Sequence, residues 1–446
     1  MTTGRISFWS SLFRDGTRSR RRFTTAVGTY VSVIFGVLGT LVAARVLGPR
    51  DFGVYSLVLV ATSFFQVLLD VTVEEALVKF GFRYTASEDW GRLQRLFRRV
   101  LRLKAIGVVL AAIALVALAP FADRIFGASN LLAPLLVAEL LPLVQAPESL
   151  AGVALILRGR YDVRGLFLAI SQGLRLLAIA VTVHHGVTAL VVGLVVAQVV
   201  ASAAVSAAGL VAFRRFPTAD AVPLGDDRRV ILRFVLQSSV GTGIVSFRSA
   251  LGTLVLGIVT NPVQVGFFRA AQAPQQGFQA LSSPARLILL TEQTRDWERG
   301  ARDAVFQSVR RYTVGAAAVT AVVAVPLIVF MPDLIRLLYR HDYSGAGDAA
   351  RIITAAAALQ LVFGWTKSFP ISIGRPALRT LGYALEAVVL IPLVSVLGHE
   401  WGATGAAGGV LGATLASTIL WAVLLLRLRR EHGTPVAAPV PREAHP

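Results

Sequence analysis

The chain contains no cysteine, which excludes disulfide bonds and thiolate metal ligation. Its six histidines are scattered without the spacing of a ligand set, so we expect no metal site. Neither a Walker motif nor a GxGxxG motif after a strand is present, and ATP hydrolysis is therefore not expected. Charged residues make up only 15% of the chain, against roughly 25% in soluble proteins. This shortage of charge, beside 55% hydrophobic residues, is typical of a membrane protein.

Long apolar runs fill most of the sequence. A helix needs about 20 apolar residues to cross the bilayer, and only helices and closed barrels satisfy their backbone there. Because the runs do not alternate as barrel strands would, they predict an all-α integral membrane protein. We expect about twelve transmembrane helices, at residues 24–47, 52–78, 104–126, 131–157, 162–184, 187–212, 234–259, 265–288, 311–331, 350–372, 378–397 and 402–426. The basic N-terminus enters the first span without a small-residue cleavage site, so this helix is expected to be retained.

The net charge of +19 is distributed unevenly. Most of the 44 basic residues fall in the segments on the side that holds both termini, and the positive-inside rule makes this side cytoplasmic. Contact with anionic headgroups, worth about 1 kcal/mol per arginine, accounts for these charges without nucleic acid. Lysine occurs only at Lys79, Lys104 and Lys367, which together with abundant Ala, Gly and Val indicates a GC-rich bacterial gene. We therefore expect a multi-pass protein of the bacterial cytoplasmic membrane.

Two short segments indicate an internal repeat. "LGPRDFGVY" (47–55) resembles "TNPVQVGFF" (260–268), and Pro262 follows Pro49 by 213 residues. A similar offset of 215 residues relates "GRYDVRGL" (159–166) to "GRPALRTL" (374–381). Since each half has six spans, the halves enter the membrane in the same direction. The sequence therefore predicts two parallel six-helix repeats, with a pseudo-twofold axis along the membrane normal and two lobes around a central cavity.

This repeat sets the expected domain boundaries. We predict a basic cytoplasmic N-terminus (1–23), an N-lobe (24–213), a polar cytoplasmic linker (214–233), a C-lobe (234–427) and a Pro-rich, disordered cytoplasmic tail (428–446). The longest outer loop, about residues 332–349, is too short for the outer domain that membrane glycosyltransferases generally carry. We therefore do not expect an enzyme.

Polar residues recur on one face of the eighth and second spans. The eighth carries Arg269, Gln272, Gln276, Gln279 and Ser283, and the second carries Ser56, Ser63, Gln66, Asp70 and Glu74. Helical spacing gathers each set into a stripe, and the 213-residue offset superposes the two. We interpret them as the walls of a hydrated cavity between the lobes. The alternative is that these amides and hydroxyls only join helices, at about 0.6 kcal/mol per hydrogen bond.

Ionisable residues inside the spans are further candidates, because they are costly in the bilayer and usually face a partner or a watery cavity. Arg248 lies on a helix face with Gly241 and Gly252, and its guanidinium suits phosphate or carboxylate. The alternative is an ion pair with Asp70, Glu74 or Glu139. Asp70 and Glu74 are candidate proton or cation sites, so coupling to an H⁺ or Na⁺ gradient is possible without any cofactor. We expect Lys367 to snorkel; for Arg175, Glu148 and Glu386 both a structural and a functional role remain open.

The segment "ARVLGPRDFGVYSLVLVATSFFQVLLDVTVEEALVKF" (44–80) resembles the bacterial polysaccharide exporters and O-antigen flippases of the multidrug/oligosaccharidyl-lipid/polysaccharide (MOP) superfamily. The matching positions are Ala44, Arg45, Leu47, Gly48, Phe52, Gly53, Tyr55 and Asp70. The chain departs from the family at Val71–Glu75, where small or hydroxyl residues are usual.

The resemblance implies a flippase for a lipid-linked sugar carried on a polyprenyl pyrophosphate, which Arg248 and Arg269 would neutralise in the cavity. One alternative is a cation-coupled drug or small-metabolite exporter that uses Asp70 or Glu74. Another is a non-transporting scaffold that recruits polysaccharide-synthesis enzymes through Arg95, Arg98 and Arg99.

Overall fold

The computed structural model describes residues 16–69 and 73–432, without the side chains of several helical stretches, 279–288 among them. In these residues the chain is helical and no strand occurs. The α-helices are α2 (Gly16–Leu69), α3 (Val73–Ala86), α4 (Trp90–Ile125), α5 (Leu132–Ala138), α6 (Leu140–Leu157), α7 (Tyr161–Thr182), α8 (Val187–Arg214), α9 (Asp227–Val259), α10 (Pro262–Ala271), α11 (Ala273–Glu298), α12 (Arg302–Tyr339), α13 (Gly347–Val362), α14 (Phe369–Ser372) and α15 (Pro376–His432). Three short 3₁₀ helices, η1 (Val183–His185), η2 (His341–Ala346) and η3 (Gly364–Lys367), connect some of them.

Seven helices in the described part are long and apolar enough to cross a membrane. Two of them, the 46-residue Phe23–Leu68 and the 55-residue Ala377–Glu431, are far longer than the roughly 20 residues that one crossing needs. Each bends at a glycine with a positive φ, Gly48 (72°) and Gly402 (57°), a conformation that side chains disfavour. Each therefore supplies two arms, and the helix order follows the predicted spans. The prediction of an all-α membrane fold is confirmed.

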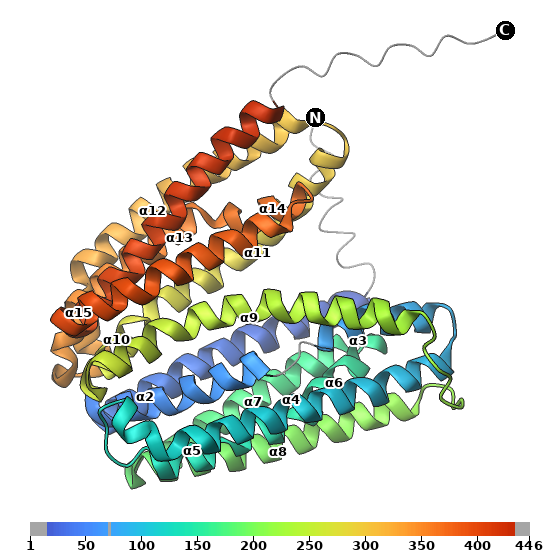
Figure 1. Cartoon of the computed structure of the whole chain (residues 1–446), viewed down its shortest axis with the longest axis horizontal. Helices are drawn as coiled ribbons and strands as arrows, with labels where there is room; N and C mark the ends of the chain where they lie inside the picture. The colour runs from blue at the N-terminus through green and yellow to red at the C-terminus, as the bar shows by residue number, and fades with distance from the viewer. Residues whose placement is uncertain (1–15, 70–72, 433–446) are drawn as a thin grey trace.

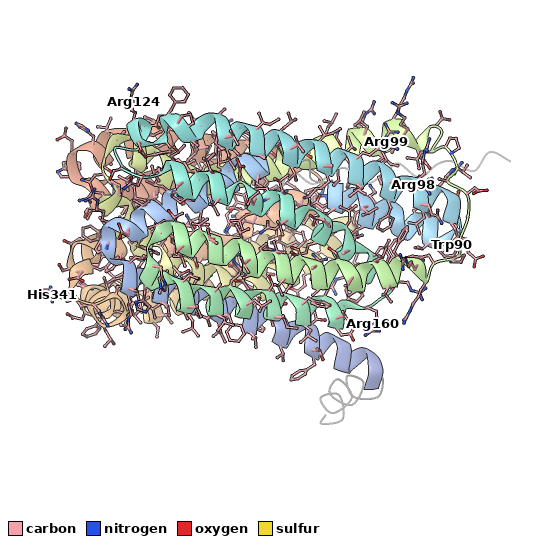
Figure 2. The ribbon with its side chains drawn as sticks, turned by 90° about the horizontal axis from the view of Figure 1, so that it is seen from below. Trp90, Arg98, Arg99, Arg124, Arg160 and His341 are labelled. Atoms are coloured by element: carbon pink, nitrogen blue, oxygen red, sulfur yellow. The ribbon has the colours of Figure 1, made fainter. Side chains whose placement is uncertain are left out.

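Figure 1 shows two helix bundles that meet at one end and diverge towards the other. We call the bundle of α2–α8 the first bundle and that of α11–α15 the second bundle; α9 packs against both α2 and α15. In Figure 2, Trp90, Arg98, Arg99 and Arg160 lie at one end of the molecule, which we call the basic end. Arg124 and His341 lie at the opposite end, where the bundles meet.

The ends of α8 and α9 can be compared with the predicted linker between the lobes. Helix α8 ends at Arg214 and α9 begins at Asp227, inside the segment predicted as a linker. The lobe boundaries themselves stay predictions, and most of the predicted terminal segments lie outside the described residues.

The two similar turns that indicated the repeat lie against each other at the opposite end. A Cβ atom on Gly266 would lie 2.0 Å from the carbonyl oxygen of Pro49, and one on Gly53 would lie 1.7 Å from that of Pro262. Only glycine permits this approach, because any side chain would displace the backbone it meets. The second arm of α2 and α10 therefore cross backbone to backbone, at equivalent positions of the two halves. The largest buried apolar cluster surrounds this crossing and includes Phe52 and Phe268.

Candidate functional site

A chain of polar side chains crosses the first bundle from α2 to α8. Gln66 Nε2 donates to Gln145 Oε1 (3.0 Å), and Gln145 Nε2 donates to Gln198 Oε1 (3.2 Å). Gln198 Nε2 then donates to Glu148 Oε2 (2.8 Å) and to Ser202 Oγ (2.9 Å). Ser202 Oγ also donates to the same carboxylate oxygen, at 2.9 Å. The carboxylate of Glu148 thus ends a hydrogen-bonded chain that links three helices.

The three glutamines and Glu148 line a cavity of about 300 Å³, which we call the N-cavity. Its wall also carries Glu74, Lys104, Arg164 and Arg175. Glu74 Oε1 lies 3.5 Å from Lys104 Nζ, so this candidate ion site already has a cationic partner. The N-cavity therefore combines carboxylates, amides and guanidinium groups inside an apolar bundle.

A second cavity, of about 420 Å³, adjoins the first and lies between α2, α7 and α11. Its lining includes Tyr55 and Leu59 from the second arm of α2, and Gln276 from α11. Gln172 and Arg175 of α7 line both cavities, so the two meet at these side chains. We call this second space the bridging cavity, because residues of both bundles line it.

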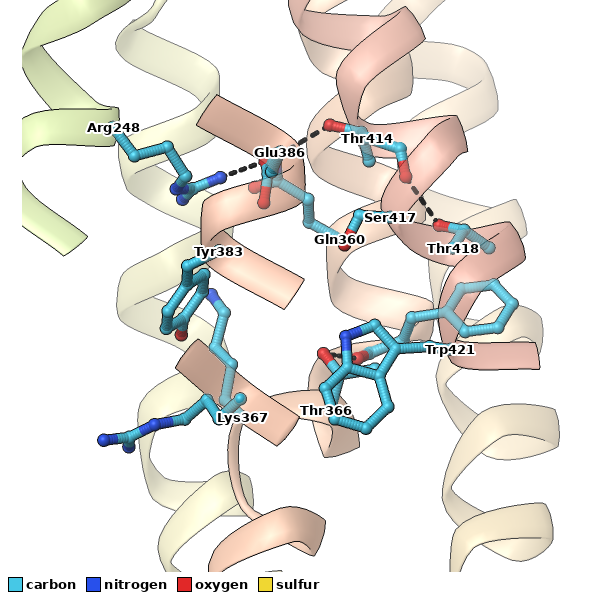
Figure 3. Close-up of a pocket in the computed structure, with 12 residues that line it drawn as sticks. Arg248, Gln360, Thr366, Lys367, Tyr383, Glu386, Thr414, Ser417, Thr418 and Trp421 are labelled. Atoms are coloured by element: carbon cyan, nitrogen blue, oxygen red, sulfur yellow. Dashed lines mark hydrogen bonds and ion pairs between the residues drawn. The ribbon is translucent and has the colours of Figure 1, made fainter. Parts of the chain in front are cut away.

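The second bundle has a polar site of its own, which we call the C-cavity (Figure 3). Arg248 of α9 forms an ion pair with Glu386 of α15, and its guanidinium lies 5.5 Å from the centre of the Tyr383 ring. Of the three partners predicted as the alternative, Glu74 is paired with Lys104, Glu139 Oε2 has no hydrogen-bond partner among the described residues, and Asp70 lies outside them. Packing explains the observed partner, since α9 lies along α15 and thus brings its arginine to Glu386. Lys367 also lines this cavity.

The hydrogen-bonded chain of the first bundle has a counterpart here. Gln275 Nε2 of α11 donates to Gln360 Oε1 of α13 (3.3 Å). Gln360 Nε2 donates to Thr414 Oγ1 of α15 (3.1 Å; Figure 3). Gln360 follows Gln145 by 215 residues, the offset found between the two halves. Sequence reasoning missed both central glutamines, although this offset could have found them.

The predicted stripe of the eighth span is interrupted. That prediction assumed one helix, but the helix breaks between α10 and α11 at Gln272. Pro274 explains the break, because proline lacks the N–H that continues a helix. Arg269 Nη1 donates to Gln272 Oε1 (2.9 Å) across the break, while Gln276 beyond it is exposed. The stripe therefore spans two helices, and its role as a cavity wall stays a prediction.

Of the other residues predicted to line the cavity, the structure describes some side chains and not others. Ser63 is exposed and donates to the carbonyl of Val60 on its own helix (3.0 Å). Gln66 faces the N-cavity. The side chain of Gln279 and the whole of Asp70 lie outside the described residues. Functional roles for all these residues stay predictions.

Comparisons with known proteins agree with this architecture. The model of a family described as "polysaccharide biosynthesis protein" matches residues 20–285. A multidrug resistance MATE family transporter of the MOP superfamily, solved in an inward-facing conformation, superposes with a TM-score of 0.72 at 15% identity, over 91% of this chain and 96% of that one. The lipid II flippase MurJ in an inward closed conformation gives 0.68 at 12% identity, over 92% and 90%. An outward-facing MATE structure gives 0.60 at 15% identity, over 93% and 95%. No curated protein matches the chain significantly.

Proposed function

Because the chain belongs to the family of polysaccharide biosynthesis proteins, we propose that it is a flippase for a lipid-linked sugar. It moves an oligosaccharide or polysaccharide precursor, carried on a polyprenyl pyrophosphate, across the bacterial cytoplasmic membrane. It works as a multi-pass transporter and not as an enzyme, with both termini in the cytoplasm. The likeness of its fold to a lipid II flippase supports this proposal.

The observation that carries the proposal is the pair of joined cavities around Arg175. Ionisable side chains within membrane helices cost at least a few kcal/mol, and they usually face a partner or a water-filled space. Arg175 lines both the N-cavity and the bridging cavity, about 300 and 420 Å³ in size. A guanidinium there can bind the oxygens of a pyrophosphate through two parallel hydrogen bonds. The sugar headgroup occupies this polar space while the polyprenyl tail stays in the lipid.

The arrangement of the bundles supports alternating access. The bundles diverge towards the basic end and meet at the opposite end (Figure 1). With the basic end in the cytoplasm, this is the state that receives the headgroup from the inner leaflet. Rocking of the bundles then opens the opposite end and releases the headgroup outside.

An export assay in a strain that lacks its own copy of the gene tests the proposal. We expect Arg175→Ala to abolish surface polysaccharide and to accumulate lipid-linked precursor in the inner leaflet, at normal protein levels. Arg124→Ala is the matched control, since Arg124 is exposed at the opposite end, away from the cavities (Figure 2). Wild-type surface polysaccharide in the Arg175 variant would remove the joined cavities from the transport path.

A cation-coupled drug or metabolite exporter is the second candidate, and the similarity of the fold to MATE transporters favours it. In this case Glu74 or Asp70 relays a proton or sodium ion. Uptake of a soluble dye into inverted vesicles, driven by a proton or sodium gradient and lost in Glu74→Gln, would support this candidate over the flippase. The scaffold alternative instead requires cavity variants to be silent and changes to Arg95, Arg98 and Arg99 to abolish function.

A further inference from the structure

We propose that the first bundle binds an anionic phospholipid of the cytoplasmic leaflet in a groove at its basic end. The groove measures about 660 Å³ and lies between the basic ends of α6, α7 and α8. Its floor is apolar, with Leu155 and Ala212 among the lining residues, and three arginines line it as well: Arg158, Arg160 and Arg215. Figure 2 places Trp90, a further lining residue, at the same end as Arg160. We call this the lipid groove.

The positive charge of the lipid groove is only partly neutralised. Arg160 forms an ion pair with Asp162 (3.2 Å), whereas the guanidinium of Arg158 lies 5.2 Å from the centre of the Phe216 ring. Neither Arg158 nor Arg215 has a salt bridge to any carboxylate in the described part of the chain, and both are exposed. Three guanidinium groups thus face one carboxylate. This leaves donors free for phosphate oxygens, which guanidinium binds in a bidentate manner.

The corresponding place in the second half carries less net positive charge. At the 215-residue offset, Arg160 corresponds to Arg375 and Phe216 to Glu431, and Arg375 Nη1 lies 3.2 Å from Glu431 Oε2. The position of Arg158 is taken by Ile373, which is buried. In the second half Glu431 thus neutralises Arg375, whereas the first half carries the ring of Phe216 at this position. Arg215 has a counterpart in Arg430, so the features specific to the first half are the unneutralised Arg158 and the ring of Phe216.

The residues around the groove indicate that its occupant is a lipid. Leu210 and Val211 beside it are 48% and 53% exposed, as expected of a surface that faces acyl chains. The Trp90 and Phe216 rings, 5.8 Å apart, supply the aromatic character typical of the membrane interface. Basic pockets between transmembrane helices on the cytoplasmic side are known to hold anionic lipid headgroups. The lipid groove shares no lining residue with the N-cavity or the bridging cavity, so its occupant is distinct from the transported headgroup.

Native mass spectrometry of the purified full chain tests this inference, with phosphatidylglycerol, cardiolipin and phosphatidylcholine as probes. We expect the wild type to retain an anionic lipid in preference to phosphatidylcholine. Replacing Arg158 and Arg215 by glutamine should weaken this binding roughly 30-fold, from the contribution of each arginine near a charged membrane surface. The control is Arg429→Gln with Arg430→Gln, which removes the same charge from the equivalent end of the second bundle and should leave the binding unchanged.

Two further measurements test the same proposal, one with a variant of the floor and one with a competing anion. Ala208→Trp fills the apolar floor without changing any charge, and it should also weaken lipid retention. Inorganic phosphate should compete poorly, because it lacks the acyl chains that occupy this floor. The proposal is overturned by undiminished retention in both the arginine and Ala208 variants, by equal loss in the control, or by competition from phosphate as effective as that from lipid. None of these outcomes depends on whether the protein transports a lipid-linked sugar.

Discussion

Arg248 pairs with Glu386, and this pairing gives a way to test whether Arg248 is only structural or also binds substrate. The two side chains are only 16% and 10% exposed, so each charge depends on the other for compensation. Replacing one partner leaves a buried charge alone, at a cost of about 3–5 kcal/mol. Replacing both by apolar residues removes the desolvation penalty together with the attraction, and such exchanges are often close to neutral.

We therefore expect Arg248→Leu and Glu386→Leu each to destabilise the protein strongly, and the double variant to recover most of the loss. Unfolding of all four proteins in detergent, followed by temperature or denaturant, measures this coupling as a double-mutant cycle. The export assay is then run on the stable double variant alone. If Arg248 also contacts the pyrophosphate, this variant folds normally and exports no polysaccharide.

Two results would contradict this reasoning. Additive losses of stability in the double variant would mean that the two side chains do not compensate each other's charge. Normal export by the double variant would show that the pair is purely structural and would remove Arg248 from the candidate substrate-binding residues.

Three other perturbations test parts of the fold. Gly266→Ala should lower the free energy of unfolding by about 1–3 kcal/mol through overpacking at the helix crossing. Gly315→Ala is the control, because nothing lies within 4 Å of the added Cβ, and it should not lower the stability. Thermal unfolding of the two variants measures the difference. Gln145→Leu should cost about 1–3 kcal/mol in the free energy of unfolding, because it leaves polar partners unsatisfied in the first bundle. Burial and the hydrogen bond from Tyr84 Oη to Asp227 (2.9 Å) raise the pKa of Tyr84 from 10.0 to about 12 at the basic end. The unfolded state then loses this proton first as pH rises, so stability falls between pH 10 and 12, and Tyr84→Phe should make that fall shallower.

The membrane made the helices predictable from the sequence, because a crossing segment has a fixed minimum length and must be apolar. The repeat was equally visible, since "LGPRDFGVY" and "TNPVQVGFF" keep Pro and Gly at the same spacing. The eighth span was expected as one helix, but it divides at Gln272, a break that Pro274 signals in the sequence. The partner of Arg248 could not be found in this way. Glu386 is 138 residues away, and only the packing of α9 on α15 brings the two together.

Hydrogen bonds at the opposite end join the two bundles beside the two similar turns. There Arg45 of the first bundle donates to the carbonyl oxygens of Leu337 and Leu338, at the C-terminal turn of α12, where a helix has no N–H partners of its own. Tyr343 Oη likewise donates to the carbonyl of Ala44 (2.8 Å). The closure thus depends on the side-chain donors of Arg45 and Tyr343 and on the close backbone approach at the glycine crossing. Opening this end exposes the same carbonyls to water, which can replace the lost donors. In the proposed cycle, rocking of the bundles has to break this seal between the two similar turns.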